Sequence, residues 1–402
     1  MSGSLYKTPI FVLLLSIFGY PIVAMFSLVS GVENQLTSIF YRLVIVFLSS
    51  LSIVCIGFAA LKVKRNLSFY YFSFLLLSFF LIFIFRAILD SYMLASEGDI
   101  TELSMFWMFL IGVTFLPTLA VALSWKHLTA QNTFLCSSGV FIGFASVTII
   151  LLVWVFYNGF DTLIGGRVEF ATLNPISIGH IGVSLLIFSY AYIMTSKAGL
   201  FYKYLVFFIS IGVGCLIIVA AGSRGPILSA AAVCIFCVAF SPKIKIYGKL
   251  GLTAIFFIFF VVVVSLFSDS MIVYRVTSGL FDDPVRNKIL GDSLNILIAN
   301  PLIGGGVFTM DTYPHNFILE SFVVGGVFCG VIYTAINLLA LYAAVHVYKS
   351  CISIVIPMLF IQYFVAGLFS GTIHEAVTFW MSLSILFFQL SYCLSSRINN
   401  GL

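Results

Sequence analysis

The stretch SDSMIVYRVTSGLFDDPVRNKILGDSLNILIANPLIGGGVFTMDTYPHN, residues 268–316, is the one extended polar segment of this chain. It ends at Tyr313-Pro314-His315-Asn316 and leads into an apolar run from Phe317 to about Val347. A polar loop that carries arginines and closes on a histidine at the start of an apolar helix indicates a reaction site at a membrane surface. We expect most of the remaining chain to hold this loop against one side of a membrane.

The composition predicts the class of protein. Of the 402 residues, 62% are hydrophobic and 8% are charged, which is more apolar surface than a soluble domain can bury. We therefore predict an all-α polytopic integral membrane protein, with residues 1–402 in a single membrane domain. The net charge of +5 does not indicate nucleic-acid binding, because the charges divide between two sides of the membrane. The eight cysteines lie in or beside apolar segments, which is typical of small buried side chains rather than of disulfides or a metal site.

About twelve apolar runs are long enough to cross a bilayer, which takes roughly twenty helical residues. They fall at 9–31, 39–61, 69–89, 104–125, 133–157, 177–195, 203–221, 226–241, 250–267, 317–347, 352–370 and 377–395. The eighth run is short and the tenth is long. The polar stretch therefore forms one large loop ahead of the tenth helix.

The charges sort into two groups on this map. Twelve cations, ten of them lysines, fall on one side. By the positive-inside rule this is the cytoplasmic side, and both termini lie there as well. This set is Lys7, Lys62, Lys64, Arg65, Lys126, Lys197, Lys203, Lys243, Lys245, Lys249, Lys349 and Arg397. The acidic residues fall on or near the opposite side, so residues 268–316 should be outside.

The outer side also carries cations, and most of them are arginines. Arginine presents a planar fork of donors that suits phosphate and carboxylate groups. This set is Arg42, Arg86, Arg167, Arg224, Arg275, Arg286 and Lys288. Pairing with the outer acids is the simpler explanation for Arg42 and Arg86, whereas Arg167, Arg224 and Arg286 are candidates for ligand binding.

Three local patterns place these arginines. Arg224 lies in a tight glycine-containing turn, residues 221–226, at the level of the lipid headgroups. Arg167 lies in the loop 158–176. Pro284 begins a predicted amphipathic helix that runs through Arg286 to about Ala299. Its predicted apolar side consists of Val285, Ile289, Leu290, Leu294 and Leu297.

Three motifs in this region resemble those of the O-antigen ligase and O-antigen polymerase superfamily. They are GSRGPIL at 222–228, Arg286 ahead of NPLIGGG at 300–306, and PHNFILE at 314–320. Two spacings of that superfamily also occur, because Leu228 follows Arg224 by four positions and Gly326 follows His315 by eleven. The motifs cover residues 222–330, about a third of the chain.

The resemblance implies a glycosyltransferase-C-like membrane enzyme that uses glycans linked through diphosphate to undecaprenol. It implies a bacterial inner membrane, an active site that faces the periplasm, and no metal or other cofactor. His315 would be the catalytic base, and Arg224 and Arg286 would bind diphosphate. Arg167 matches only as an arginine in the corresponding loop. Arg275 and Lys288 are further candidates for substrate binding, and Glu320 would orient His315 or bind the acceptor.

The residue types fit this chemistry. A sugar that leaves a lipid diphosphate places charge on phosphate oxygens, which fixed guanidinium groups stabilise. The attacking sugar hydroxyl is a poor nucleophile and benefits from a base within hydrogen-bond distance. At a helix N-terminus, His315 should favour the neutral form that accepts a proton.

Several alternatives stay open. A polymerase would transfer the growing glycan to another lipid-linked repeat unit, with a chain-length-regulating co-polymerase as a partner, whereas a ligase would transfer it to lipid A–core. A flippase or transporter for lipid-linked sugars would also need arginines at the membrane. A metal-dependent transferase would use Glu97 and Asp99 as ligands. His374-Glu375, in a short outer turn, is a secondary candidate for the site.

Overall fold

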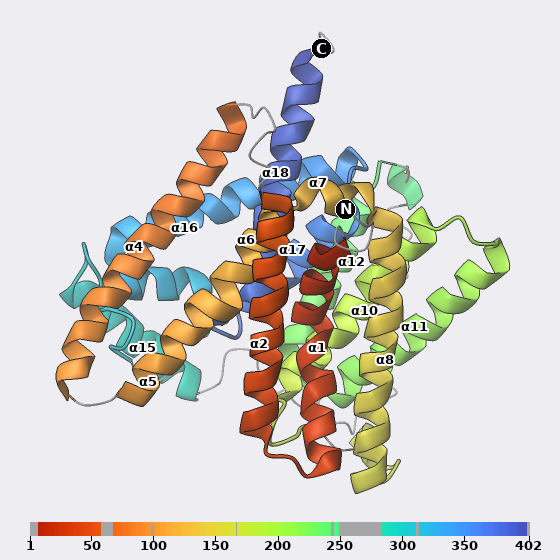
Figure 1. Cartoon of the computed structure of the whole chain (residues 1–402), viewed down its shortest axis with the longest axis horizontal. Helices are drawn as coiled ribbons and strands as arrows, with labels where there is room; N and C mark the ends of the chain where they lie inside the picture. The colour runs from red at the N-terminus through yellow and green to blue at the C-terminus, as the bar shows by residue number, and fades with distance from the viewer. Residues whose placement is uncertain are drawn as a thin grey trace.

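The protein is a bundle of helices that contains long apolar segments (Figure 1). The computed structural model describes residues 7–57, 67–97, 100–165, 167–242, 245–248, 284–310 and 313–399. Within these ranges no strand forms, and a single isolated bridge joins Phe170 and Leu173. The all-α class predicted from composition is confirmed for the described residues.

The helices of the first half of the chain occupy both flanks of the bundle in Figure 1. Their bounds are α1 Thr8–Ser30, α2 Asn34–Ser52, η2 Ile53–Gly57, α4 Leu67–Glu97, α5 Ile100–Trp107, η3 Met108–Phe115, α6 Leu116–Leu123, α7 Trp125–Ala130, α8 Asn132–Asn158, α9 Thr162–Gly165 and α10 Pro175–Thr195. The later helices are α11 Leu200–Ala220, α12 Arg224–Phe240, α15 Pro284–Ala299, α16 Phe317–Lys349, α17 Val355–Gly367, η4 Ile373–Glu375 and α18 Val377–Asn399.

Nine of the described helical segments are long and apolar enough to cross a membrane, and α12 and α17 are shorter apolar helices. The protein is therefore a multi-pass membrane protein. Every predicted apolar run inside the described ranges coincides with one of these helices. The ninth predicted run, 250–267, lies outside the described residues, as do residues 268–283 and 311–312 of the predicted loop 268–316.

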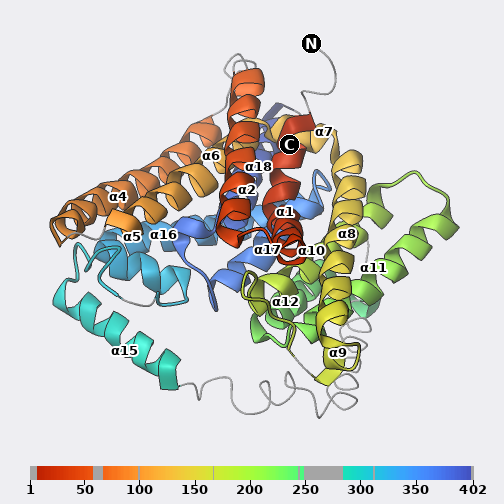
Figure 2. The same ribbon diagram turned by 60° about the horizontal axis from the view of Figure 1, so that its bottom comes forward.

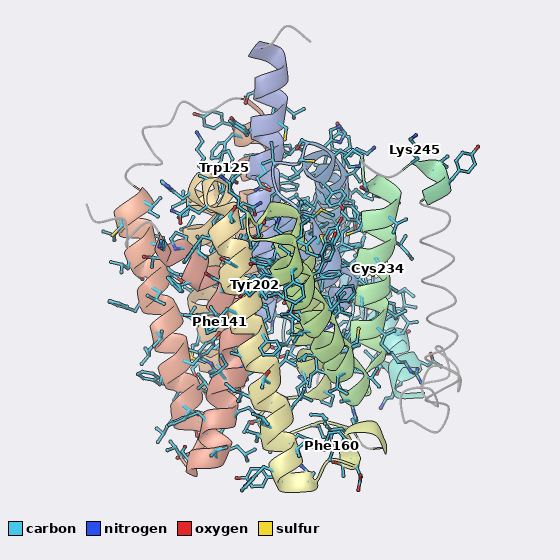
Figure 3. The ribbon with its side chains drawn as sticks, turned by 90° about the vertical axis from the view of Figure 1, so that its right-hand side faces the viewer. Trp125, Phe141, Phe160, Tyr202, Cys234 and Lys245 are labelled. Atoms are coloured by element: carbon cyan, nitrogen blue, oxygen red, sulfur yellow. The ribbon has the colours of Figure 1, made fainter. Side chains whose placement is uncertain are left out.

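The bundle has two distinct ends. The connection from α1 to α2 lies at the lower end in Figure 1, as does the end of α8, beside which Figure 2 labels the short helix α9. Helix α7 and the C-terminal part of α18 lie at the upper end. Figure 3 shows Trp125 and Lys245 toward one end and Phe160 at the other. Between the ends, Phe141 on α8 is 75% exposed, as is typical of a side chain that faces lipid. We call the end that carries α9 the α9 face.

Helix α16 is broken near its start. Gly325 has φ −128° and ψ 21°, and Gly326 has φ 64° and ψ −161°, so the helical path stops and resumes at these two residues. A positive φ is strained for residues with a Cβ. A Cβ on Gly326 would also clash with the backbone carbonyl group of Leu302. The glycine eleven positions after His315 is therefore required by the backbone.

The polar groups exposed by the break are paired with the loop at 301–306. In a continuous helix the amide of Val327 would donate to the carbonyl of Val323. Here Val327 N donates to Pro301 O at 2.8 Å, and Gly305 N donates to Val323 O at 2.8 Å. Unpaired backbone groups are costly inside a membrane, so this exchange holds the loop and the broken helix together.

A carboxylate from α4 holds the other end of this loop. Asp90 Oδ2 accepts a hydrogen bond from Val307 N at 2.7 Å, and Arg86 lies 3.3 Å from Oδ1 of the same residue. Gly306 has φ 113°, and a Cβ there would lie 2.5 Å from Asp90 Oδ2. The simpler explanation for Arg86, pairing with an acid, is confirmed.

Helix α15 begins at Pro284, so the helix predicted over 284–299 is confirmed. Its predicted apolar side is only partly correct. Ile289 and Ser293 are buried, since α15 packs along α16, whereas Leu290 and Leu294 are exposed. Packing against a neighbouring helix, rather than hydrophobicity alone, sets which side of α15 is covered.

The short helix α17 leaves a turn inside the bundle. Thirteen residues extend about 20 Å, less than the roughly 30 Å hydrocarbon thickness of a bilayer. After α17, His374 O accepts a hydrogen bond from Thr114 Oγ1 at 2.6 Å, and Thr114 lies near the middle of the candidate span Leu103–Leu123. Residues 368–376 therefore descend below the helix ends, and we call them the inner turn.

Aromatic packing supports the inner turn from below. Trp380 stacks on Phe79 at 5.4 Å between ring centroids and contacts Phe80 at 4.6 Å. Its indole nitrogen donates to Ile373 O at 2.9 Å. This ring therefore satisfies a turn carbonyl while it joins α18 to α4.

The break predicts a graded response to alanine substitution. Gly326→Ala combines a positive φ with a backbone clash. Gly31→Ala has a positive φ but nothing within 4 Å, and Gly212→Ala has neither. A positive φ alone costs roughly 1–2 kcal/mol for a residue with a Cβ. In detergent, the thermal unfolding midpoint should therefore be lowest for Gly326→Ala, higher for Gly31→Ala and highest for Gly212→Ala. Equal midpoints for Gly326→Ala and Gly31→Ala would show that the 301–306 loop moves to accommodate the added methyl group with no loss of stability.

Candidate active site

Two of the predicted arginines meet at the α9 face. Val168 N donates to Ala220 O at 2.8 Å, which ties the residue after Arg167 to the end of α11. Gly222 has φ 58°, and a Cβ on it would lie 3.3 Å from Arg167 Cγ. The Arg167 side chain therefore lies across the Gly222 turn, two residues before Arg224 begins α12.

Glu169 lies close to the Arg167 guanidinium group. Arg167 Nη1 lies 3.5 Å from Glu169 Oε2, and the Glu169 side chain is 57% exposed. An ion pair this open to solvent contributes little, about 0–1 kcal/mol. The side chain also packs on Gly222, beside the N-terminus of α12, where the helix dipole favours an anion.

His180 lies beside this turn, although no sequence pattern groups it with Arg224. A Cβ on Gly225 would be 3.8 Å from His180 Nε2. The side chain is buried, and both ring nitrogens lack a hydrogen-bond partner among the described residues. Only the tertiary contact between α10 and α12 brings it here, through Gly179, whose Cβ would meet Pro226.

His315 lies at the start of α16, as predicted. Asn316 caps this helix, since its Oδ1 accepts hydrogen bonds from Ile318 N at 3.0 Å and Leu319 N at 3.1 Å. His315 is half-buried and has φ 52°, an uncommon conformation for a residue with a Cβ. Backbone strain of this kind is concentrated at functional sites, which keeps His315 a candidate for the reaction.

Glu320 is buried and binds the inner turn. Its Oε1 accepts a hydrogen bond from Thr372 Oγ1 at 2.6 Å, and Ile373 N lies 3.1 Å from both carboxylate oxygens. Thr372 Oγ1 is also 2.8 Å from His374 Nδ1. A connected set of polar groups therefore runs from Glu320 through Thr372 to His374, and the turn is held by a carboxylate rather than by solvent.

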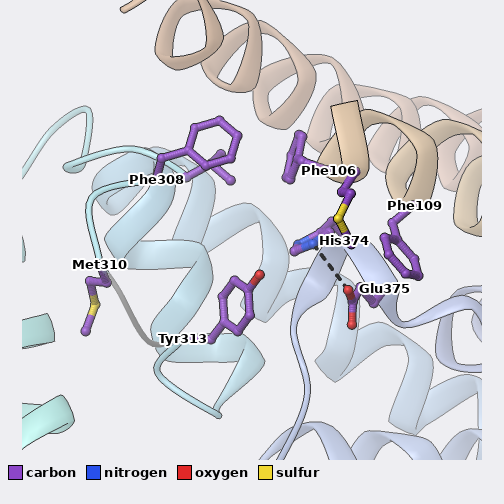
Figure 4. A pocket seen from close by; sticks show the side chains of 9 residues that line it. Phe106, Phe109, Phe308, Met310, Tyr313, His374 and Glu375 are labelled. Carbon is purple, nitrogen blue, oxygen red and sulfur yellow. Dashed lines mark ion pairs between the residues drawn. The ribbon is translucent and has the colours of Figure 1, made fainter. Parts of the chain in front are cut away.

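A pocket of about 170 Å³ opens beside this turn (Figure 4). Its walls come from α5 and η3, from the segment after the 301–306 loop, and from the inner turn. The lining residues are Met105, Phe106, Phe109, Val307, Phe308, Met310, Tyr313, His374 and Glu375. A smaller cavity, lined in part by Tyr313, Pro314 and Glu320, adjoins it. We call the larger one the aromatic pocket.

The aromatic pocket carries little charge at neutral pH. Burial lowers the pKa of His374 to about 4, so its ring is neutral and its contact of 3.8 Å with Glu375 is not an ion pair. Burial also raises the pKa of Glu375, an effect that the nearby Arg42 opposes. Arg42 itself lies over the Phe109 ring at 4.3 Å, behind the pocket wall.

The predicted site residues thus fall into separate groups. Arg167 and Arg224 lie together near α12, whereas His315, Glu320 and the aromatic pocket lie at the start of α16. Lys288 is exposed on α15, which packs along α16 and lies on the opposite flank from α9 in Figures 1 and 2. Arg286 is described only as part of the α15 backbone, and Arg275 and Asp99 lie outside the described residues.

His374-Glu375, predicted as a secondary candidate in a short outer turn, is more central to the candidate site than expected. The turn is inside the bundle, and both residues line the aromatic pocket. Thr372 and Tyr313 were not singled out. Their sequence context carries no signal for this role, because the pocket is assembled from segments about 270 positions apart (Phe106 and His374).

A scan against models of known protein families gives no match for this chain, and a search of curated proteins gives none either.

The buried His374 should make stability sensitive to acid. Its pKa falls from 6.5 to about 4 on folding, so between these values the unfolded chain binds a proton that the folded protein does not. Between pH 6.5 and about 4, stability should therefore decrease as the pH is lowered, by about 1.4 kcal/mol per pH unit. We expect the unfolding midpoint of His374→Gln to fall less steeply than that of the wild type between pH 6.5 and 4, with parallel curves above pH 7. Parallel curves throughout would contradict the buried neutral assignment.

Proposed function

We propose that this protein is a metal-independent glycosyltransferase that moves a glycan from undecaprenyl diphosphate onto an acceptor sugar. The preferred reaction is O-antigen polymerisation, or that of a related surface polysaccharide, with another undecaprenyl-diphosphate-linked repeat unit as acceptor. The proposed location is the bacterial inner membrane, with both termini cytoplasmic and the α9 face toward the periplasm.

The observation that carries the proposal is the meeting of Arg167 with the Arg224 turn. These residues are 57 positions apart in sequence, yet Arg167 lies across Gly222 at the start of α12. Two guanidinium groups beside a helix N-terminus at the end of a membrane bundle suit the diphosphate of a lipid carrier. The lipid tail would remain in the bilayer while the headgroup reaches the arginines.

The proposed step is a direct displacement. The acceptor hydroxyl oxygen forms a bond to the anomeric carbon of the donor sugar as the bond from that carbon to the diphosphate oxygen breaks. The electron pair leaves on phosphate, where arginines stabilise it, and His315 takes the hydroxyl proton. Because the nucleophile attacks opposite the leaving group, the anomeric configuration inverts.

Ligation to lipid A–core uses the same chemistry with a different acceptor, and it stays the alternative. The form Pro314-His315-Asn316 with Leu319-Glu320 favours polymerase, since this arrangement looks more polymerase-like than ligase-like. A co-polymerase that regulates chain length would be a partner of a polymerase and not of a ligase.

A flippase or transporter is the second candidate, and the break in α16 favours it. Transporters often bind substrates at interrupted helices. Here, however, the freed groups of Val323 and Val327 are bonded to the 301–306 loop, so neither is left to bind an ion or a substrate. The transferase is therefore preferred.

The reaction can be tested with purified protein and defined lipid-diphosphate repeat units. We expect a ladder of longer glycans from repeat units alone, and we expect it to persist after exhaustive EDTA treatment, since arginines take the place of a cation at the diphosphate. Product that forms only with lipid A–core would mean a ligase. Movement of repeat units across vesicles without any product would mean a transporter, and restoration by Mg²⁺ after EDTA would support a metal-dependent enzyme.

Binding and chemistry should separate in the kinetics of two variants. Arg224→Lys keeps a charge but loses the planar fork, so it should mainly raise KM for the lipid-linked donor. His315→Gln keeps hydrogen bonding without basicity, so kcat should fall by about 10²–10⁴-fold with donor binding retained. His127→Gln, on α7 at the opposite end of the bundle, is the matched control and should match wild type. Near-normal turnover by His315→Gln would remove the assignment of His315 as base.

A further inference from the structure

The aromatic pocket lies next to the proposed base but apart from the two arginines. Tyr313, in its wall, is two residues before His315, and Phe308 and Met310 come from the segment that follows the 301–306 loop. The opposite wall is made by η3 and the inner turn, whose His374 ring contacts Phe106 at 4.7 Å between centroids. The pocket therefore depends on the same loop that carries His315.

The chemistry of its walls selects a class of ligand. Rings of Phe106, Phe109, Phe308 and Tyr313 surround the space, and His374 and Glu375 provide polar atoms on one side (Figure 4). A sugar ring presents apolar C–H faces that stack on aromatic rings and hydroxyl edges that bond to imidazole and carboxylate groups. A volume of about 170 Å³ is below the roughly 300–1,000 Å³ of sites for drug-sized ligands and suits a single sugar ring.

The same walls disfavour a phosphate. None of the described lining residues is a lysine or arginine, and Glu375 would repel an anion. The donor sugar is bonded directly to diphosphate, so its phosphates would lie close to any pocket that held it. An acceptor sugar at the far end of its glycan carries its hydroxyl without a phosphate nearby. The pocket is thus matched to the acceptor and the Arg167–Arg224 pair to the donor.

We infer that the aromatic pocket is the acceptor-saccharide subsite, in which His374 and Glu375 bond sugar hydroxyls and the aromatic rings stack on the sugar face. The identification of the bound sugar as the acceptor rests on the proposed function. Saccharide binding by the pocket does not depend on that function.

Thr372 is the positioning residue for this subsite. It joins Glu320 to His374, at 2.6 Å and 2.8 Å. Thr372 Oγ1 donates its proton to Glu320 Oε1, so the hydroxyl oxygen is left to accept from Nδ1–H of His374. The Nε2 atom is then left as an acceptor on the side of the ring that faces Glu375, and a sugar hydroxyl can donate to it.

Saturation-transfer NMR on the full-length protein in detergent tests the subsite without requiring turnover. The probes are methyl glycosides of common hexoses and the free oligosaccharide released from the host's lipid-linked pool. We expect saturation of ring C–H protons in wild type and a loss of affinity of about three- to tenfold in Phe308→Leu and Glu375→Gln. Phe328→Leu is the matched control, because Phe328 lies on α16, is 62% exposed and lines neither pocket.

The kinetic arm uses conservative variants at Thr372. Thr372→Val, which removes the hydroxyl, should raise KM for a lipid-free oligosaccharide acceptor several-fold while leaving KM for the undecaprenyl-diphosphate-linked donor unchanged, and Thr372→Ser should restore the lower acceptor KM. A purely structural hydroxyl would lower stability in Thr372→Val without this split between the two substrates.

The outcomes separate the subsite from the reaction. Glycan ladders with no saccharide saturation, or saturation that Phe308→Leu leaves unchanged, would overturn the subsite and leave the proposed function standing. Saccharide binding that depends on Phe308 and Glu375, with no glycosyl transfer, would support the pocket and overturn the proposed function. Equal loss in Phe328→Leu would show detergent-surface binding and also overturn the subsite.

Discussion

The pairing between the break in α16 and the 301–306 loop is the constraint on which the candidate site depends. Val327 N and Val323 O, which a continuous helix would bond to each other, bond instead to Pro301 O and Gly305 N. Inside a membrane these groups have no water to satisfy them, so neither the loop nor the break is stable without the other. The loop then leads directly to Tyr313 and His315, and the first turns of α16 carry Glu320 to the inner turn.

The inner turn shows how polar side chains compensate for irregular backbone in a membrane protein. Glu320 accepts hydrogen bonds from Thr372 and Ile373, Thr114 donates to His374 O, and Trp380 donates to Ile373 O. The bonds to Ile373 N, His374 O and Ile373 O satisfy backbone groups that a continuous helix would have satisfied internally. The short length of α17 creates this requirement, and the same turn supplies the polar side of the aromatic pocket.

The arrangement separates charge from apolar surface. Arg167 packs on Gly222, two residues before Arg224 begins α12, whereas the described walls of the aromatic pocket carry rings, a neutral histidine and the carboxyl group of Glu375. Between them lies α17, with Tyr363 near His180 on one side and Gly367 beneath Phe317 on the other. A reaction between a lipid diphosphate and a neutral sugar needs two such environments, one for each partner.

The sequence by itself determined the membrane class, the helices within the described ranges, the helix over 284–299 and the place of His315 at a helix start. These features follow from runs of apolar residues, from Pro284 and from the Asn316 cap, which are all local. The meeting of Arg167 with Gly222, the covered side of α15, the descent of His374 into the bundle and the aromatic pocket were decided only by the tertiary structure. Each depends on contacts between distant segments, and hydrophobic periodicity carries no information on which segments meet when nearly every helix is apolar on all sides.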